Sequence, residues 1–265
     1  MKYELFVSDF DGTLGNAPDE INPETLAAVK KYVEKGGKFV ICTGRMYSSV
    51  KKICLKYGLG GTVVSFQGAM INNLSDGKTI LEGGIDYVLA EKVASELLKE
   101  KVPTVVDIDD VLYCEEYTPY TDYHKGLCNI QLVPSILKVV EQFKKPVHKI
   151  VSVGNPERIK ELTEKYSAIY KNQLIFNSGG DVILEVINPE FSKGKAIRYL
   201  SKYFSIPYDK IIAVGDSTND IEMINGPWHG VAVGDAKEEL KKYADEITVP
   251  YSEKPVKVLL EKYCL

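Results

Sequence analysis

Short apolar runs alternate with helical patterns at both ends of this 265-residue chain, and this alternation is the strongest constraint on its fold. The first part of the chain contains strand Glu4–Ser8, a helix opened by Asn22 and Pro23 and ended by Gly36, strand Lys38–Cys42, helix Tyr47–Tyr57 and strand Thr62–Phe66. Strands that are joined through helices pair in parallel, with right-handed crossovers. The pattern therefore predicts a parallel α/β sheet.

The same alternation returns near the C-terminus, after a middle part of different character. The later elements are helix Lys193–Tyr203, strand Lys210–Val214, helix Asp220–Ile224, strand Gly230–Val233 and helix Lys237–Tyr243. The middle part mixes helices with hairpins, such as strands Thr104–Ile108 and Val111–Glu115 around a tight turn at Asp109-Asp110. We therefore predict a Rossmann-like doubly wound parallel core, residues 1–82 and 187–265, interrupted by an inserted α+β domain, residues 83–186.

Composition narrows the function classes. The 33 basic and 37 acidic residues give a net charge of −4, so no overall field attracts nucleic acid or an anionic membrane. The five cysteines are widely spaced and free of CxxC, which fits reduced thiols. The N-terminal apolar run is too short for a signal peptide, and no run approaches a membrane span. We expect a cytoplasmic protein, monomer or homodimer, that binds a small molecule and neither nucleic acid nor membrane.

Polar residues gather where the predicted strands end. Asp9 and Asp11 follow the first strand, Thr43–Arg45 follow the second, and Gly215–Asp220 follow a strand of the C-terminal part. Ligands of parallel α/β sheets bind outside the carboxyl ends of the strands. Lys193 lies at the start of a nearby helix and can reach the same edge. We therefore expect these residues to line one pocket.

The carboxylates of this set predict a metal site beside a phosphate site. Asp9 and Asp11 are two residues apart, so an extended backbone would point both side chains to one side. These like charges repel each other, and Asp216 adds a third negative charge. A hard cation such as Mg²⁺ that binds all three carboxylates would offset this repulsion. The hydroxyl and amides of Thr43–Arg45 form the kind of loop that holds a phosphate, and Lys193 supplies a compact positive charge.

A phosphate held beside a carboxylate favours phosphoryl transfer to that carboxylate, through an aspartyl-phosphate intermediate. The second carboxylate would then protonate the leaving oxygen and afterwards activate the water that hydrolyses the intermediate. Gly12 lets the backbone turn away at once, which keeps both side chains exposed.

Four short motifs resemble those of the haloacid dehalogenase (HAD) superfamily. They are DFDGTL at Asp9–Leu14, TGR at Thr43–Arg45, SKG at Ser192–Gly194 and GDSTNDIEM at Gly215–Met223. Their order and spacing, and the long insert between the second and third motifs, are similar to the Cof-type phosphatases of subfamily IIB. Taken singly, each motif is also explained as a turn or a helix cap, so the resemblance depends on all four together.

The resemblance implies a Mg²⁺-dependent phosphatase and a role for each motif residue. Asp9 would be the nucleophile and a metal ligand, and Asp11 the acid/base that also offers its backbone carbonyl to Mg²⁺. Lys193 would take part in catalysis by neutralising the transferring phosphoryl group. The other implied site residues are Thr43, Gly44, Arg45 and Asn219 for the phosphate, and Asp216 and Asp220 for the metal. The insert would be a mobile cap that closes over the pocket and selects the leaving group.

Two positions outside the motifs depart from the family pattern. Gln67-Gly68-Ala69 stands where members often carry asparagine before Gly-Ala, and Gly234-Asp235-Ala236 stands where they often read Gly-Asn-Ala. Gln67 lies near the expected cap hinge, where it is placed to alter what the pocket accepts.

Three functions remain open at this point. The leading hypothesis is hydrolysis of a small phosphorylated metabolite such as a sugar phosphate. A phosphosugar mutase would use the same intermediate but pass the phosphoryl group to a second sugar hydroxyl. A non-catalytic phosphorylation receiver also uses aspartates, a hydroxyl and a lysine, but an acid at Asp11 has a use only where a leaving group is turned over.

Overall fold

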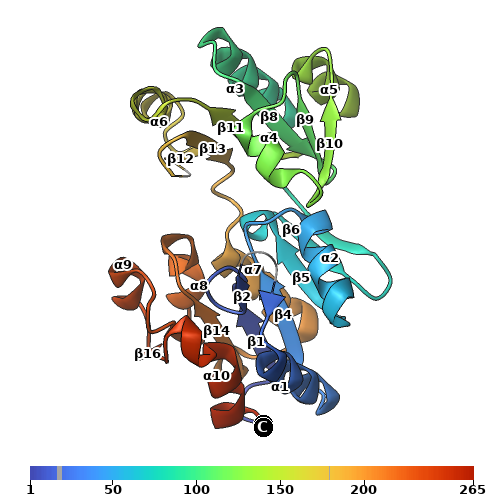
Figure 1. Cartoon of the computed structure of the whole chain (residues 1–265), viewed down its shortest axis with the longest axis vertical. Helices are drawn as coiled ribbons and strands as arrows, with labels where there is room; N and C mark the ends of the chain where they lie inside the picture. Colours follow the sequence, from blue (N-terminus) through green and yellow to red (C-terminus); the bar gives the residue numbers. More distant parts are fainter. Residues whose placement is uncertain (17–19, 179) are drawn as a thin grey trace. The chain divides into compact units, whose positions relative to one another are not determined.

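The structure, a computed structural model, describes residues 1–16, 20–178 and 180–265. The chain divides into two compact units (Figure 1). The first unit contains Met1–Leu81 and Ser192–Leu265, and the second contains Glu82–Phe191. Within the described residues, no helix is both long and apolar enough to cross a membrane.

A largely parallel sheet forms the centre of the first unit and confirms the predicted α/β class. Its described strands are β1 (Leu5–Ser8), β4 (Lys38–Cys42), β5 (Thr62–Ser65), β6 (Met70–Asn73), β7 (Thr79–Glu82), β14 (Ile211–Gly215), β15 (His229–Ala232) and β16 (Glu246–Ile247). The order is β16-β15-β14-β1-β4-β5-β6-β7, with parallel pairing from β16 to β5. The chain adds β4 and β5 on one side of β1, and β14 and β15 on the other. The switch point of this doubly wound sheet, where ligands bind, therefore lies beside β1.

Helices and short turns connect the strands of the first unit. The helices are α1 (Pro23–Glu34), α2 (Tyr47–Tyr57), α7 (Lys193–Phe204), α8 (Ile221–Ile224), α9 (Glu238–Lys241) and α10 (Pro255–Tyr263). The short elements are β2 (Gly15–Asn16), β3 (Glu20–Ile21), η1 (Phe66–Gly68), η2 (Tyr208–Lys210), η3 (Thr218–Asp220) and η4 (Tyr251–Glu253). Local signals set the boundaries: the Asn22 side chain accepts the N–H of Glu24 at the start of α1, and Gly58 ends α2 at a φ of 62°.

The second unit is an α+β sandwich with its own sheet. Its strands are β8 (Thr104–Ile108), β9 (Val111–Cys114), β10 (Asn129–Leu132), β11 (Val147–Val153), β12 (Ile175–Ser178) and β13 (Ile183–Ile187), in the order β10-β9-β8-β11-β13-β12. Its helices are α3 (Tyr87–Lys99), α4 (Pro119–His124), α5 (Ile136–Phe143) and α6 (Pro156–Ile169). The predicted turn at Asp109-Asp110 is confirmed, because both residues have positive φ, 54° and 60°, between antiparallel β8 and β9.

Asp107, on strand β8, is a buried carboxylate in this second unit. Its side chain is fully buried, and neither carboxylate oxygen has a hydrogen-bond partner among the described residues. Lys149 lies opposite on β11, but its Nζ donates to Glu185 Oε1 at 2.9 Å. Burial raises the pKa of Asp107 to about 7, because the positive charge of Lys149 offsets the burial only in part.

Replacing Asp107 by asparagine should stabilise the protein more at high pH than at low pH. The folded-state pKa of about 7 lies above the ordinary value of 3.8, so the stability present below pH 3.8 is lost as the pH rises towards 7. We expect the gain in unfolding free energy of Asp107→Asn over wild type to be about 2–3 kcal/mol larger at pH 8 than at pH 5. Urea unfolding at the two pH values measures it.

The matched control is Asp181→Asn, which makes the same change at an exposed position of the same unit. Its stability should follow that of wild type at both pH values. An Asp107→Asn effect of equal size at both pH values would contradict the predicted titration of Asp107.

Candidate active site

The carboxyl ends of β1, β4 and β14 bring three motif loops to one edge of the first sheet. Asp9 directly follows β1, and its N–H donates to Val214 O at 2.9 Å. Thr43 directly follows β4, and its N–H donates to Val64 O at 2.9 Å. Asp216 directly follows β14. The sheet pairing thus extends into the site and fixes the backbone at Asp9 and at Thr43, where the predicted phosphate loop begins.

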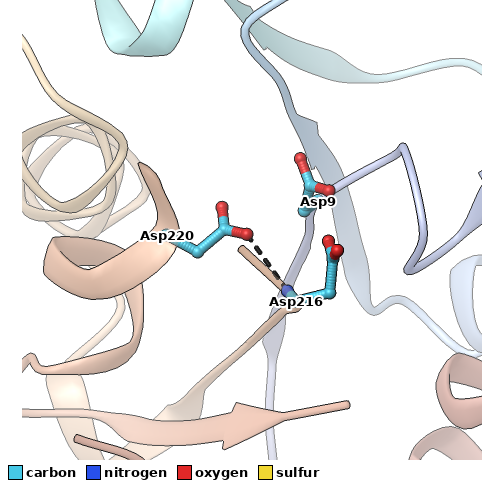
Figure 2. Close-up of side chains that lie close together, drawn as sticks. All are labelled: Asp9, Asp216 and Asp220. Carbon is cyan, nitrogen blue, oxygen red and sulfur yellow. Dashed lines mark hydrogen bonds between the residues drawn. The ribbon is translucent and has the colours of Figure 1, made fainter. Parts of the chain in front are cut away.

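Three carboxylates meet at this edge, as Figure 2 shows. One oxygen each of Asp9, Asp216 and Asp220 lies within 4.8 Å of the others. Asp9 and Asp220 are buried, and Asp216 is partly buried. Burial raises the pKa of Asp9 well above its usual range and also raises the pKa of Asp216, and in both cases the neighbouring Asp220 charge adds to the effect. A cluster of carboxylate oxygens is the donor set that a hard divalent cation such as Mg²⁺ prefers, so these residues fit the implied metal.

Lys193 supplies the opposing charge from the first residue of α7. Its side chain is 1% exposed, and Nζ donates to Asp9 Oδ1 and to Asp220 Oδ1, each at 2.6 Å. Burial alone would lower the pKa of Lys193, but the two carboxylates outweigh it and raise the pKa above its ordinary value. Ser192 caps α7 by accepting the N–H of Lys195, and its hydroxyl also bonds the carboxylate of Glu222. These contacts fix the start of the helix that carries the lysine.

Asp220 holds its own loop together. Its Oδ2 accepts the N–H groups of Asp216 and Ser217, both at 3.1 Å, while its Oδ1 accepts from Lys193. Both oxygens therefore already have partners within the chain.

Thr13 adds a contact that sequence reasoning missed, since its hydroxyl donates to Asp216 Oδ1 at 3.2 Å. The only signal for Thr13 was its place inside DFDGTL.

Asp11 lies outside the carboxylate cluster. Strand β1 ends at Ser8, and Phe10 O accepts the N–H groups of Leu14 and Gly15 in a tight turn, so extended geometry does not reach Asp11. The Asp11 carboxylate is instead bound by Arg45, with Nε to Oδ2 at 2.8 Å and Nη2 to Oδ1 at 2.7 Å. The Asp11 side chain is 50% exposed. Arg45, which was predicted to bind phosphate, is thus paired with the predicted acid.

The loop after β4, which is predicted to bind the phosphate, is compact. The Thr43 hydroxyl is buried and accepts the N–H of Arg45 at 3.2 Å. At Gly44, a Cβ would lie 2.4 Å from Gln67 Nε2, so a side chain there would have to displace the Gln67 carboxamide. Asn219, on the neighbouring motif loop, donates from Nδ2 to Gln67 Oε1 at 3.3 Å. Gly44 and Asn219, two of the predicted phosphate ligands, therefore both lie beside the Gln67 side chain.

Gly12 is required where the first motif passes the fourth. Its φ is +80°, and a Cβ at this position would lie 2.8 Å from Asp216 Oδ2. Both the backbone conformation and the space exclude a side chain. The glycine of DFDGTL therefore lets the first loop approach the carboxylate cluster closely.

Comparison with known proteins identifies relatives along nearly the whole chain. Residues 6–260 match the family described as haloacid dehalogenase-like hydrolase. A Haemophilus influenzae relative is 28% identical over 271 residues, which cover 99% of this chain and 98% of its own. The 5-amino-6-(5-phospho-D-ribitylamino)uracil phosphatase YwtE of Bacillus subtilis is 26% identical over 282 residues, which cover 96% of each chain.

A solved structure shows the same fold. TM0651 from Thermotoga maritima is 27% identical and superposes with a TM-score of 0.87, over 98% of this chain and 97% of its own. The fold, the motif loops gathered at one sheet edge and the match over residues 6–260 lead to one conclusion. The chain belongs to the haloacid dehalogenase-like hydrolase family.

Proposed function

We propose that this protein is a Mg²⁺-dependent phosphatase that hydrolyses small phosphorylated metabolites, sugar phosphates among them, through an aspartyl-phosphate on Asp9. The observation that carries the proposal is the buried Asp9 carboxylate, which Lys193 holds at 2.6 Å beside Asp216 and Asp220. A relative whose name gives a phosphorylated ribitylaminouracil as substrate supports the small-metabolite class. In this proposal the second unit is the cap that selects the leaving group.

Asp9 attacks phosphorus in the first step. Lys193 binds Oδ1 and thereby orients the carboxylate, which leaves Oδ2 to form the new bond to phosphorus. As the bond between phosphorus and the leaving oxygen breaks, Asp11 gives that oxygen a proton. Thr43, the amide of Gly44 and Asn219 bind the oxygens of the phosphoryl group.

Water completes the cycle. Asp11, now a carboxylate, takes a proton from the water that attacks phosphorus, so inorganic phosphate leaves and the Asp9 carboxylate is restored. Mg²⁺ would be held by Asp9, Asp216 and the backbone carbonyl of Asp11. Asp220 positions these ligands indirectly, because its carboxylate accepts hydrogen bonds from Lys193 and from the Asp216 amide. When bound, the ion neutralises charge on the phosphoryl oxygens.

Arg45 links substrate binding to the acid. Its guanidinium binds the Asp11 carboxylate through two hydrogen bonds. A phosphate dianion also offers two oxygens to the planar guanidinium group of Arg45, and it carries more negative charge than the Asp11 carboxylate. Phosphate binding therefore draws Arg45 from Asp11 and leaves Asp11 free to carry the proton that the leaving oxygen needs.

Asp9→Asn should lose at least about 10³-fold in kcat on an aryl phosphate, because the amide is not a nucleophile. The substitution keeps the side-chain volume, so we expect the folded state to persist, and circular dichroism tests this. The turnover of p-nitrophenyl phosphate in Mg²⁺ is the measurement. Asp209→Asn, an exposed aspartate of the same unit, is the matched control and should keep wild-type turnover. Retained activity in Asp9→Asn would refute Asp9 as the nucleophile.

Removal of divalent cations with EDTA should abolish turnover, and added Mg²⁺ should restore it. Asp216→Asn, which loses one predicted ligand charge, should raise the Mg²⁺ concentration for half-maximal activity by at least about tenfold. A Mg²⁺ titration of wild type and variant gives both results. Full turnover after EDTA treatment and dialysis would show that the reaction does not need the metal.

Product identity separates the proposal from its alternatives. With a hexose 1-phosphate as substrate, we expect inorganic phosphate and free sugar. An isomerised sugar phosphate would identify a mutase. A stably phosphorylated protein without turnover would identify a phosphorylation receiver.

A further inference from the structure

The turn η1, between β5 and β6, has an unusual backbone. Phe66, Gln67 and Gly68 are three consecutive residues with positive φ, at 49°, 57° and 104°. This region suits glycine, whereas other residues adopt it at a cost of about 1 kcal/mol or more. Residues kept in such conformations cluster at functional sites, where surrounding contacts hold them.

The contacts that hold this turn come from the predicted phosphate loop. Phe66 N–H donates to Arg45 O at 2.9 Å, and Gln67 N–H donates to Thr43 O at 3.1 Å. At Gly68, a Cβ would lie 2.3 Å from Ser192 O, so the turn also packs closely on the residue before Lys193. The turn is thus fixed by the second and third motifs.

The Gln67 side chain completes a connection to the fourth motif. Its Oε1 accepts from Asn219 Nδ2 at 3.3 Å, and its carboxamide fills the space over Gly44. One side chain therefore contacts a residue of the second motif and a residue of the fourth, and both are predicted to bind the phosphate.

We propose that Gln67 is a positioning residue of the phosphate site, which holds the Asn219 carboxamide in place for the phosphoryl group and closes the side of the loop at Gly44. The inference rests on the proposed function. Asparagine is one methylene shorter than glutamine, so the contact between the two carboxamides depends on the length of the Gln67 side chain.

Gln67→Asn is the sharpest variant, because asparagine tolerates positive φ and keeps the amide but shortens its reach. We expect KM for p-nitrophenyl phosphate and the inhibition constant of inorganic phosphate to rise about fivefold each, the effect of one lost hydrogen bond. We expect kcat to change less than about twofold, since the contact acts on binding. Gln173→Asn, the same change at an exposed position of the second unit, should leave both constants unchanged.

A double-mutant cycle tests whether Gln67 acts through Asn219. In an Asn219→Ala background, the further change Gln67→Asn should alter the inhibition constant of phosphate by less than about twofold. Equal factors in the two backgrounds would overturn the proposal, as would an unchanged inhibition constant in Gln67→Asn or Asn219→Ala. Thermal unfolding checks that each variant folds, and Gln67→Gly, which accepts the same φ without strain, replaces Gln67→Asn if that variant does not.

Failure of the proposed function gives a different result. If wild type neither hydrolyses the aryl phosphate nor binds inorganic phosphate, the phosphatase assignment fails and the positioning role fails with it. If wild type does both and only Gln67→Asn has no effect, the phosphatase assignment stands and the role of Gln67 alone is refuted.

Discussion

The buried ammonium of Lys193 is the interaction on which the rest of the site depends. It binds Asp9 and Asp220, which lie 184 and 27 residues away in the sequence. Without it, the two buried carboxylates would face each other and Asp216 without the ammonium group that binds them. Removing one partner of a buried ion pair commonly costs about 3–5 kcal/mol, because the other charge stays buried. The lysine therefore connects α7 to the loops that follow β1 and β14, and it orients Asp9, the proposed nucleophile.

Further hydrogen bonds hold the elements around Asp9, the proposed nucleophile, in place. Asp220 binds two amides of its own loop, and Ser192 connects α7 to Glu222 on α8. Asp11, the proposed acid, differs from Asp9, since its side chain is half exposed and is bound by Arg45. The structure thus buries the proposed nucleophile against Lys193 and leaves the proposed acid half exposed beside Arg45.

The sequence predicted the long, strongly patterned elements well and the short ones poorly. Strand β4 and helix α2 have the predicted bounds, because apolar periodicity, proline and glycine act locally. Helix α4, strand β10 and helix α5 were not predicted. Strand β10 is short and mostly exposed and pairs only with β9 among the described strands, so its sequence gives too short a pattern of apolar and polar residues to indicate a strand. Helix α10 was also missed, although its buried face includes Leu259 and Leu260.

The sequence by itself determined which polar residues follow the strand ends: several carboxylates, a hydroxyl and, at a helix start, a lysine. It also determined that a doubly wound sheet would bring these residues to one edge. These inferences hold because strand periodicity and motif spacing are local properties. Only the tertiary structure decided that Asp11 binds Arg45 outside the carboxylate cluster, that Gln67 bridges two motif loops and that the buried Asp107 carboxylate has no hydrogen-bond partner among the described residues. Each depends on the path of the backbone beyond a strand end or on neighbours distant in sequence, which no local pattern encodes.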